Sequence, residues 1–551
     1  MDARREFLKT MSMAGGLWTL SEGLSERRVY AEETIHSQGT DSIAVRTLEP
    51  GRLIPFLCLD ATNQPDSVVV CPMPANKDPD PVLPKNPKVG SPDEGDLMYA
   101  TVVIDPETKR FRMWYWGEAQ AKLGVTGGMR GFTTSMLYAE SQDGLDWERP
   151  ELGFVAFRGS RKNNILDTAS TARFHPRTVL LDETEADPRK RFKCLGSTSR
   201  GAHLSYSEDG IRWRKSGIAP IANKKARFHE SCCFLMDPDC PDPEKRFKWF
   251  NQFPWGNDIP DPRWDCPAYK TLPGSQIYST DALDRRRIGV AYGPDEAHMT
   301  VSPTLAMDPD EGLEEQIHLI SVTPYEGYYL ALYEYSWFDL EVRTDRSDLR
   351  LAVSRDGLQF ERIQNQVSVV PRGPVGTWDD GNVISPNQLV RVGDELWIYY
   401  SGSPAEFGLM GSPKGWPLAC EAGYGPQIGR AVLPYDSVTC VRVRPWRFRG
   451  SFRSDPLTPG KKLPQFLQAN MTRPSNTRPH IVDCAGPVDK AFRITVNEED
   501  GTVVAALEPV TGVAGRFKIP QEMFDRRGPT PFRFHVSIED PYYGICSLKA
   551  L

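Results

Sequence analysis

Along most of this chain, apolar residues occur in short runs that end at Asp, Pro or Gly. The run 97–104 is followed by an aromatic run, 110–116, and then by 135–140. Short apolar runs bounded by turn residues are typical of strands rather than helices. We therefore expect three strands and no helix between residues 95 and 150.

Two turns from this region return further along the chain. An Asp-Pro turn followed by basic and aromatic residues begins at Asp105, Asp187 and Asp242. A Ser-x-Asp-Gly-x-x-aromatic turn begins at Ser141, Ser207 and Ser354, with a weaker copy at Ser279. Asp accepts hydrogen bonds from its own downstream backbone, and Gly permits a positive φ. The turn aspartates lie roughly 65–80 residues apart, which suits one four-stranded sheet per repeat and predicts a propeller.

Five segments are predicted to be the inner strands of the blades. They are 98–104, 178–181, 231–236, 300–307 and 382–390. We expect a five-bladed propeller over residues 41–445, with an N-terminal strand such as 67–71 completing the last blade and closing the ring.

After residue 444 the pattern changes to strict apolar–polar alternation. It is seen in 492–496, 503–507 and 532–536. Alternation of period two is typical of half-buried antiparallel strands. The predicted fold class is therefore all-β, a five-bladed β-propeller followed by a C-terminal β-sandwich at 450–551.

Composition agrees with this fold and narrows the function. The 551 residues include 47 Pro and 45 Gly, as expected for many turns, and 39% are hydrophobic, which excludes a disordered chain. The formal net charge of -7 argues against a nucleic-acid partner.

The N-terminus predicts export. Arg4-Arg5 followed by Phe7-Leu8-Lys9 and a weakly apolar run, 11–20, resembles a bacterial twin-arginine signal peptide over residues 1–31. No other apolar run is long enough to span a bilayer. We expect a periplasmic or extracellular protein without a membrane span.

The chain has eleven cysteines and no zinc-like pair of Cys-x-x-Cys motifs. Most are expected to be buried small apolar side chains. A disulfide among Cys233, Cys240 and Cys266 remains an alternative, since sequence does not fix connectivity.

The predicted inner strands place polar residues together. In a propeller these strands surround a central channel, so the residues just before them converge on one funnel. Those residues are Asp96, His175, Arg177, His229, Glu230, Asp295, Glu296, His298, Asp379 and Asp380.

Several carboxylates among His and Arg in one pocket suit cleavage of a glycosidic bond. One carboxyl group must be protonated and a second ionised, which requires their pKa values to differ. We expect Glu230 to be the acid, with a raised pKa, and Asp96 or Asp380 to be the base or nucleophile. The substrate-binding residues are then predicted to be His175, Arg177, His229, Glu296, His298 and Asp379.

The blade pattern resembles the five-bladed propeller glycosidases, the superfamily of invertases, levanases, arabinanases and β-xylosidases. Trp114-Tyr115-Trp116-Gly117 and 397–402 resemble their second-strand motifs, and 138–147 resembles their third-strand turn. The resemblance implies an Asp at the start of blades one and two and a Glu acid in blade three. Glu230 fits the third position, Asp96 fits the first loosely, and blade two has His175-Pro176-Arg177 instead of Asp.

The leading interpretation is an exported glycoside hydrolase acting on an oligo- or polysaccharide without a required cofactor. The missing blade-two Asp favours the alternative, a non-catalytic carbohydrate-binding or interaction propeller. A third alternative is a channel metal, either Ca²⁺ or a transition metal held by three histidines and a Glu. The Ser-x-Asp turns also resemble those of sialidases, but three arginines and a Tyr nucleophile are not placed.

Overall fold

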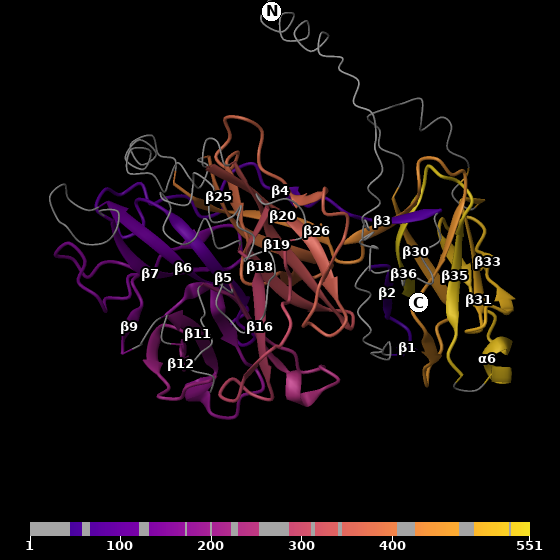
Figure 1. Cartoon of the computed structure of the whole chain (residues 1–551), viewed down its shortest axis with the longest axis horizontal. Helices are drawn as coiled ribbons and strands as arrows, with labels where there is room; N and C mark the ends of the chain where they lie inside the picture. Colours follow the sequence, from indigo (N-terminus) through magenta and orange to yellow (C-terminus); the bar gives the residue numbers. More distant parts are fainter. Residues whose placement is uncertain are drawn as a thin grey trace, which may run out of the picture. The chain divides into compact units, whose positions relative to one another are not determined.

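The computed structural model is built almost entirely of strands (Figure 1). The α-helix α6 (Glu522–Arg527) and single 3-10 turns interrupt them. The structure describes residues 45–57, 67–120, 132–170, 174–198, 201–221, 230–252, 286–309, 315–339, 344–404, 425–472, 487, 490–527 and 530–551. Among these residues no helix is long and apolar enough to cross a bilayer.

The first three blades are separate antiparallel sheets in chain order. Blade one consists of β5 (Leu97–Ile104), β6 (Phe111–Gln120), β7 (Phe132–Ser141) and β8 (Trp147–Glu148). Blade two consists of β10 (Val179–Leu181), β11 (Phe192–Thr198), β12 (Gly201–Ser207) and β13 (Arg212–Lys215), with β9 (Asp167–Ser170) beside β13. Blade three consists of β14 (Ser231–Met236), β15 (Phe247–Gln252), β16 (Ile288–Gly293) and β17 (Thr300–Val301).

Blades four and five are joined by a short pairing of β20 with β23. Blade four consists of β18 (Glu315–Tyr325), β19 (Tyr328–Asp339) and β20 (Thr344–Ser354), flanked by β21 (Glu361–Arg362) and β22 (Ser368–Val370). Blade five consists of β23 (Asn382–Ile384), β24 (Val390–Val392), β25 (Glu395–Ser403), β26 (Gln427–Pro434) and β4 (Asn76–Lys77). The predicted all-β propeller is confirmed, and its described strands form four sheets, the largest of which runs from β18 to β26 and β4.

The inner strands converge around Asn387, which is fully buried. Its side-chain Nδ2 donates to the Val179 carbonyl at 3.2 Å, and its Oδ1 accepts from the Phe234 amide at 3.2 Å. Its backbone N–H donates to the Ala100 carbonyl at 3.3 Å. One blade-five residue therefore ties the inner strands of blades one, two and three together.

The prediction that 300–307 is the inner strand of blade four is wrong. Thr300–Val301 is β17, the outer strand of blade three, and it pairs with β16. The inner strand of blade four is β18, which pairs with β19 over its whole length. The segment 294–299 is therefore the hairpin between strands three and four of blade three.

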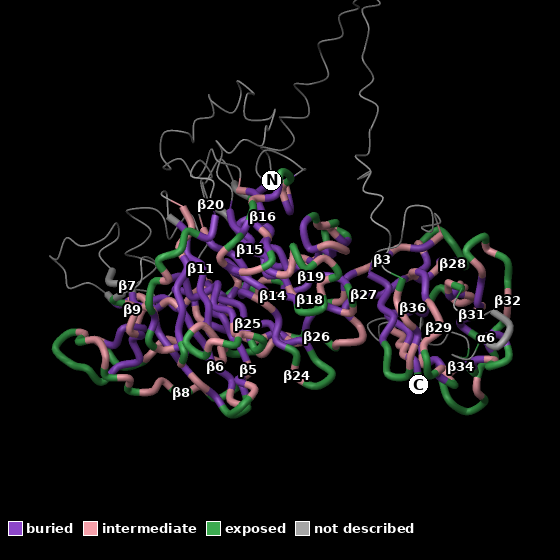
Figure 2. The backbone as a smooth tube through the Cα atoms, turned by 90° about the horizontal axis from the view of Figure 1, so that it is seen from below, coloured by how far each residue is buried: buried purple, intermediate pink, exposed green. Residues whose placement is uncertain are grey.

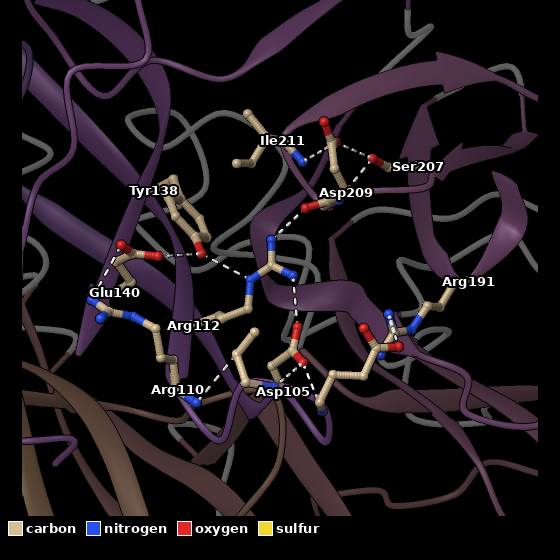
Figure 3. Close-up of polar contacts among 12 residues, drawn as sticks. Asp105, Arg110, Arg112, Tyr138, Glu140, Arg191, Ser207, Asp209 and Ile211 are labelled. Atoms are coloured by element: carbon tan, nitrogen blue, oxygen red, sulfur yellow. Dashed lines mark hydrogen bonds and ion pairs between the residues drawn. The ribbon is translucent and has the colours of Figure 1, made fainter. Parts of the chain in front are cut away.

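The Ser-x-Asp-Gly turns join one blade to the next, as Figure 3 shows for blades one and two. In the turn of blade two, Asp209 Oδ1 accepts from the amides of Ile211 and Arg212, both at 2.8 Å. The Asp209 carbonyl accepts from the guanidinium of Arg112 on β6, which also binds Asp105 Oδ2 at 3.2 Å. A repeated local motif thus provides the contacts between blades.

The C-terminal region forms two larger sheets and one two-stranded sheet. One consists of β28 (Gly450–Arg453), β35 (Arg533–Ile538), β31 (Phe492–Asn497) and β32 (Val503–Ala506). The other contains β27 (Thr439–Val443), β36 (Gly544–Ala550), β30 (Phe466–Thr472), β34 (Arg516–Lys518) and β33 (Glu508–Pro509). On β35 buried residues alternate with half-buried ones, as the period-two pattern predicted.

The predicted domain boundaries need one correction. Strand β1 (Arg46–Leu48) pairs with β29 (Leu457–Pro459), β2 (Leu53–Pro55) with β36, and β3 (Val68–Pro72) with β27. These N-terminal strands pair with C-terminal strands and not with the propeller. Strands β2 and β3 lie in the sheet of β36 and β27, and β1 forms a separate two-stranded sheet with β29. The strand that completes blade five is instead β4, which pairs with β26.

Most strands are buried, as the purple segments of Figure 2 show. Cys233 and Cys240 carry free thiols, and Cys266 lies outside the described residues. Cys194, Cys232, Cys233, Cys440 and Cys546 are buried, in agreement with the expectation of small apolar side chains.

Candidate active site

Glu230 directly precedes β14, and its side chain is 17% exposed to solvent. Its Oε1 is 3.9 Å from Nε2 of His175, and its Oε2 is 3.7 Å from Nε2 of His318. Both imidazoles are almost completely buried. A partly open carboxylate thus stands between two enclosed imidazoles from blades two and four.

Irregular pairing in the inner strands brings these groups together. The register shifts between Met98 and Thr101 on β5, between Ser231 and Cys233 on β14, and between Ile317 and Ile320 on β18. A β-bulge changes the direction of a side chain and is frequent beside active sites. His318 lies within the third of these bulges.

Tyr99 occupies the bulge of blade one with a φ of 59°, an uncommon value for a residue other than glycine. Its ring lies 5.7 Å from the His175 ring, and the Arg177 guanidinium lies 5.2 Å from the Tyr99 ring centroid. Burial, and then the nearby Glu230 carboxylate, raise the pKa of Tyr99 well above its usual value. Tyr99 therefore stays neutral beside the carboxylate.

Glu334 on β19 contacts the ring nitrogen of His318 that faces away from Glu230. Its Oε1 is 2.8 Å from Nδ1 of His318, and its side chain is 2% exposed. The other carboxylate oxygen, Oε2, is buried and makes no hydrogen bond to any residue that the structure describes. Gln252 fixes the backbones of the pair, since its N–H donates to the Glu230 carbonyl and its Nε2 to the His318 carbonyl.

The charges of this cluster stabilise one another. Burial alone would raise the pKa of Glu230, but His318, His175 and Arg177 outweigh it and hold that pKa far below its usual value. Burial alone would lower the pKa of His318, but Glu334 and Glu230 raise it to about 9. At neutral pH the protonated imidazole of His318 therefore lies beside the ionised Glu230.

The expectation that Glu230 has a raised pKa is therefore wrong, which removes the reason for assigning it as the acid. It rested on the apolar residues of β14, and sequence alone did not reveal that His318 faces the carboxylate. An ionised Glu230 suits a base or a nucleophile.

Arg177 lies within the 3-10 turn η1 (Pro176–Thr178) and is fully buried. Its Nε donates to the Cys232 carbonyl and its Nη2 to the Pro386 carbonyl, both at 3.4 Å. It connects blades two, three and five, and its full burial makes a direct contact with substrate unexpected.

Two further predicted site carboxylates, Asp96 and Asp379, are almost completely buried. Asp96 is 3% exposed, and its Oδ1 lies beside Gly425, where a Cβ would come within 1.8 Å. Asp379, also 3% exposed, forms an ion pair with Lys77 and accepts from the Tyr400 hydroxyl at 2.8 Å. Burial limits access of a substrate to both side chains.

Asp380 differs from these two. It precedes β23 at the leading end of an inner strand and is half-buried. Its Oδ2 accepts from the Gly376 amide at 2.6 Å. It is the predicted catalytic carboxylate, apart from Glu230, that stays partly open at such an end.

Glu296 and His298 do not belong to the funnel. They lie in the hairpin between β16 and β17, where Asp295 Oδ1 accepts from the His298 amide at 2.9 Å. In a four-stranded antiparallel blade this hairpin is at the opposite end from the start of the first strand. Glu296 accepts from the Tyr206 hydroxyl at 2.8 Å, so its role is structural. His229 lies outside the described residues.

The predicted metal site is not seen among the residues that the structure describes. They contain no group of three or more His, Cys, Asp or Glu side chains placed to hold a metal ion. His298 lies in the hairpin between β16 and β17, so one of the three histidines proposed as ligands is not in the funnel.

Sequence reasoning missed His318, Glu334 and Tyr99. His318 lies on β18, and the sequence analysis placed the inner strand of blade four before it, at 300–307. The long apolar run of β18, which contains this histidine, was the signal that could have identified it.

No family model and no curated protein matches this chain. Solved structures that resemble it include a glycosyl hydrolase from Bacteroides ovatus, at 15% identity and a TM-score of 0.40, covering 66% of this chain and 94% of that one. An N-acetylgalactosamine deacetylase from F. plautii, solved with blood group B trisaccharide, has 14% identity and a TM-score of 0.40, covering 66% and 96%. A chain named glycoside hydrolase has 13% identity and a TM-score of 0.41, covering 66% and 92%.

Proposed function

We propose that this chain is an exported glycoside hydrolase that cleaves an oligo- or polysaccharide at the Glu230 cluster. The observation that supports this most is the ionised, partly open Glu230 at the end of an inner strand, within 4 Å of two imidazoles. An enclosed anion beside cationic and neutral hydrogen-bond donors suits the oxocarbenium-like transition state of glycosidic cleavage.

In this proposal Glu230 is the base that takes a proton from the attacking water. The water oxygen forms a bond to the anomeric carbon as the glycosidic C–O bond breaks. The leaving oxygen needs a proton, and we assign its donor to Asp380, the other partly open carboxyl group at an inner-strand end. His318, held by Glu334, keeps Glu230 ionised until the proton arrives.

The proposal needs no cofactor, because Glu230, Asp380 and water account for every proton and bond. A chelator is therefore expected to leave the rate of sugar release unchanged. A rate that falls with chelation and returns with Ca²⁺ or a transition metal would favour a metal in the channel instead.

The test is release of reducing sugar from a panel of plant and algal polysaccharides. Wild type is compared with Glu230→Gln, with Asp380→Asn, and with Glu244→Gln as a matched control on an exposed turn of blade three. We expect release by wild type and the control, and none by the two site variants. Release that survives Glu230→Gln would contradict this assignment.

The alternative is a carbohydrate-binding propeller without catalysis. It is favoured by the burial of Asp96 and Asp379, which leaves few carboxyl groups accessible to a substrate. Glycan binding without release from any substrate would support it over hydrolysis.

We also propose export through the Arg4-Arg5 leader, which lies outside the described residues. Replacing both arginines by lysine in a bacterial host with a twin-arginine system is expected to retain the protein in the cytoplasm. Unchanged appearance in the periplasm would contradict this route.

A further inference from the structure

The loop 444–449 joins β27 to β28 and exposes two aromatic side chains. Trp446 is 68% exposed and Phe448 is 86% exposed, more than any other tryptophan or phenylalanine side chain that the structure describes. Neither side chain contributes to a core at this exposure. Large exposed apolar side chains of this kind mark interaction sites.

The same loop carries three arginines, Arg444, Arg447 and Arg449. The Arg444 guanidinium lies 5.7 Å from the Trp446 ring centroid. The Arg449 side chain is 76% exposed, and its Nε is 3.3 Å from Oε2 of Glu539. In a chain whose net charge is -7, this loop is a local concentration of positive charge.

The loop is fixed at both ends. The Arg444 N–H donates to the Ser67 carbonyl at 2.9 Å, and the Arg447 N–H closes the turn onto the Arg444 carbonyl at 2.9 Å. A Cβ on Gly450 would come within 2.5 Å of Val68, so the chain packs closely where the loop ends. The backbone of the loop is therefore held in place before any ligand binds, which lowers the entropic cost of ordering the loop on binding.

We propose that the loop 444–449 is an accessory binding site for an anionic polysaccharide, with carboxylated or sulfated sugars. This inference rests on the proposed function, since it names the substrate class of the same enzyme. The C–H face of a sugar ring carries partial positive charge and stacks on the negative face of Trp446 or Phe448. Arg447 and Arg449 pair with the acidic groups, because a guanidinium binds a carboxylate or sulfate through two parallel hydrogen bonds.

Two other anionic partners fit less well. A nucleic-acid surface is normally carried by a basic protein, and this chain is acidic. Anchoring at a membrane surface needs a continuous apolar face, whereas here each ring alternates with an arginine. Interleaved rings and cations match a polymer that presents sugar faces and acidic groups in alternation.

The experiment measures binding of the full chain to polygalacturonate, to neutral dextran and to vesicles of anionic phospholipid, at low and high salt. One double variant replaces Trp446 and Phe448 by Ala, and another replaces Arg447 and Arg449 by Gln. The matched controls are Tyr542→Ala, exposed in the turn before β36, and Arg493→Gln, exposed on β31.

We expect wild type to bind polygalacturonate at least about tenfold more tightly than dextran. Each double variant is expected to lose at least about tenfold in affinity, with salt weakening the wild type and the controls unchanged. Equal binding by wild type and the double variants, or equal affinity for dextran, would overturn the proposal. Binding confined to vesicles would assign the loop to membranes instead.

This inference and the proposed function fail separately. If the loop binds polygalacturonate but no glycan is cleaved, the hydrolase is wrong and the binding site stands. If glycans are cleaved and the loop variants bind as wild type does, the hydrolase stands and the binding site is wrong.

Discussion

At the scale of single residues, the site depends on His318. It faces Glu230 at 3.7 Å on one side and Glu334 at 2.8 Å on the other. Its protonated form is favoured because two carboxylates outweigh the cost of its burial. The ionisation state of Glu230 therefore depends on a histidine that belongs to another blade.

This charge makes stability depend on pH. The pKa of His318 is raised from 6.5 to about 9 by folding, so its contribution is fully present below pH 6.5 and is lost as pH rises through 9. The loss amounts to at most about 3 kcal/mol of unfolding free energy. We expect urea midpoints of wild type to fall between pH 6.5 and 9.

The matched variants for this prediction are His318→Gln and Glu334→Gln. The first removes the titrating group and the second removes the carboxylate that raises its pKa most. Both are expected to flatten the pH dependence over this window. A dependence as steep as that of wild type would show that another group titrates there.

Sequence reasoning placed Glu230 and His175 at the funnel, but it missed His318, Glu334 and Tyr99. The segments that carry Glu230 and His175 precede recognisable strands, so their position at the funnel followed from the repeat. His318, Glu334 and Tyr99 lie inside strands, and two of them owe their direction to bulges. A bulge leaves no mark in hydrophobic alternation, and so these residues could not be placed.

At the scale of elements, the Ser-x-Asp-Gly turn is the part that holds neighbouring blades together. Gly210 has a φ of +72°, and its carbonyl accepts from the Trp114 indole at 2.6 Å. In blade one, the carbonyl of Gly144 accepts in the same way from the Tyr399 hydroxyl of blade five at 2.9 Å. The sequence predicted this turn correctly, because its chemistry is local.

Gly210→Ala tests how tightly the blades pack. A Cβ there would meet the Trp114 ring at 2.8 Å and the Arg112 guanidinium at 3.0 Å, so crowding adds to the backbone strain. We expect a loss of about 2–4 kcal/mol in unfolding free energy, measured by urea denaturation.

The control is Gly217→Ala. Gly217 has a φ of +80° but has no atom within 4 Å of the added carbon, so it reports the backbone strain alone. That variant is expected to lose about 1–2 kcal/mol. Equal losses at the two glycines would mean that the turn does not pack on blade one.

The hairpin of blade three shows why one element was placed wrongly. Its sequence lacks the Ser and Gly of the other copies, yet Asp295 accepts the same downstream amides as Asp209 does. The conformation survives because the Asp provides the hydrogen bonds by itself. Glu296 and His298 were assigned to the funnel because this turn was not identified.

At the scale of the whole molecule, closure of the ring depends on β4. This short strand pairs with β26, and Lys77 within it forms an ion pair with Asp379, which is 3% exposed. Lys77 also donates to the Pro371 carbonyl at 2.8 Å. An N-terminal closing strand was predicted, but β3 was expected where β4 is found.

Asp379→Ala removes the partner of an enclosed lysine. Breaking one side of a buried ion pair leaves an uncompensated charge, and we expect unfolding free energy to fall by about 3 kcal/mol. Asp394→Ala, an exposed position just before β25 in the same blade, serves as control and should change little. Equal urea midpoints for the two variants would contradict the role of this ion pair in closure.

The sequence predicted the all-β class, the propeller and the C-terminal sheets, because repeated turns and apolar–polar alternation can be recognised within short segments. The membership of β1, β2 and β3 in the C-terminal sheets was not predicted. Their pairing partners lie more than 360 residues away in the sequence, and alternation alone does not identify a partner.

The central claim is that Glu230 is the catalytic anion and that Glu296 is not part of the site. It is tested most directly by kcat/KM of Glu230→Gln and Glu296→Gln on the best substrate of the polysaccharide panel. We predict a loss of about 10²–10⁴-fold for Glu230→Gln and a value within about twofold of wild type for Glu296→Gln. Comparable losses in both variants, or no loss in Glu230→Gln, would contradict it.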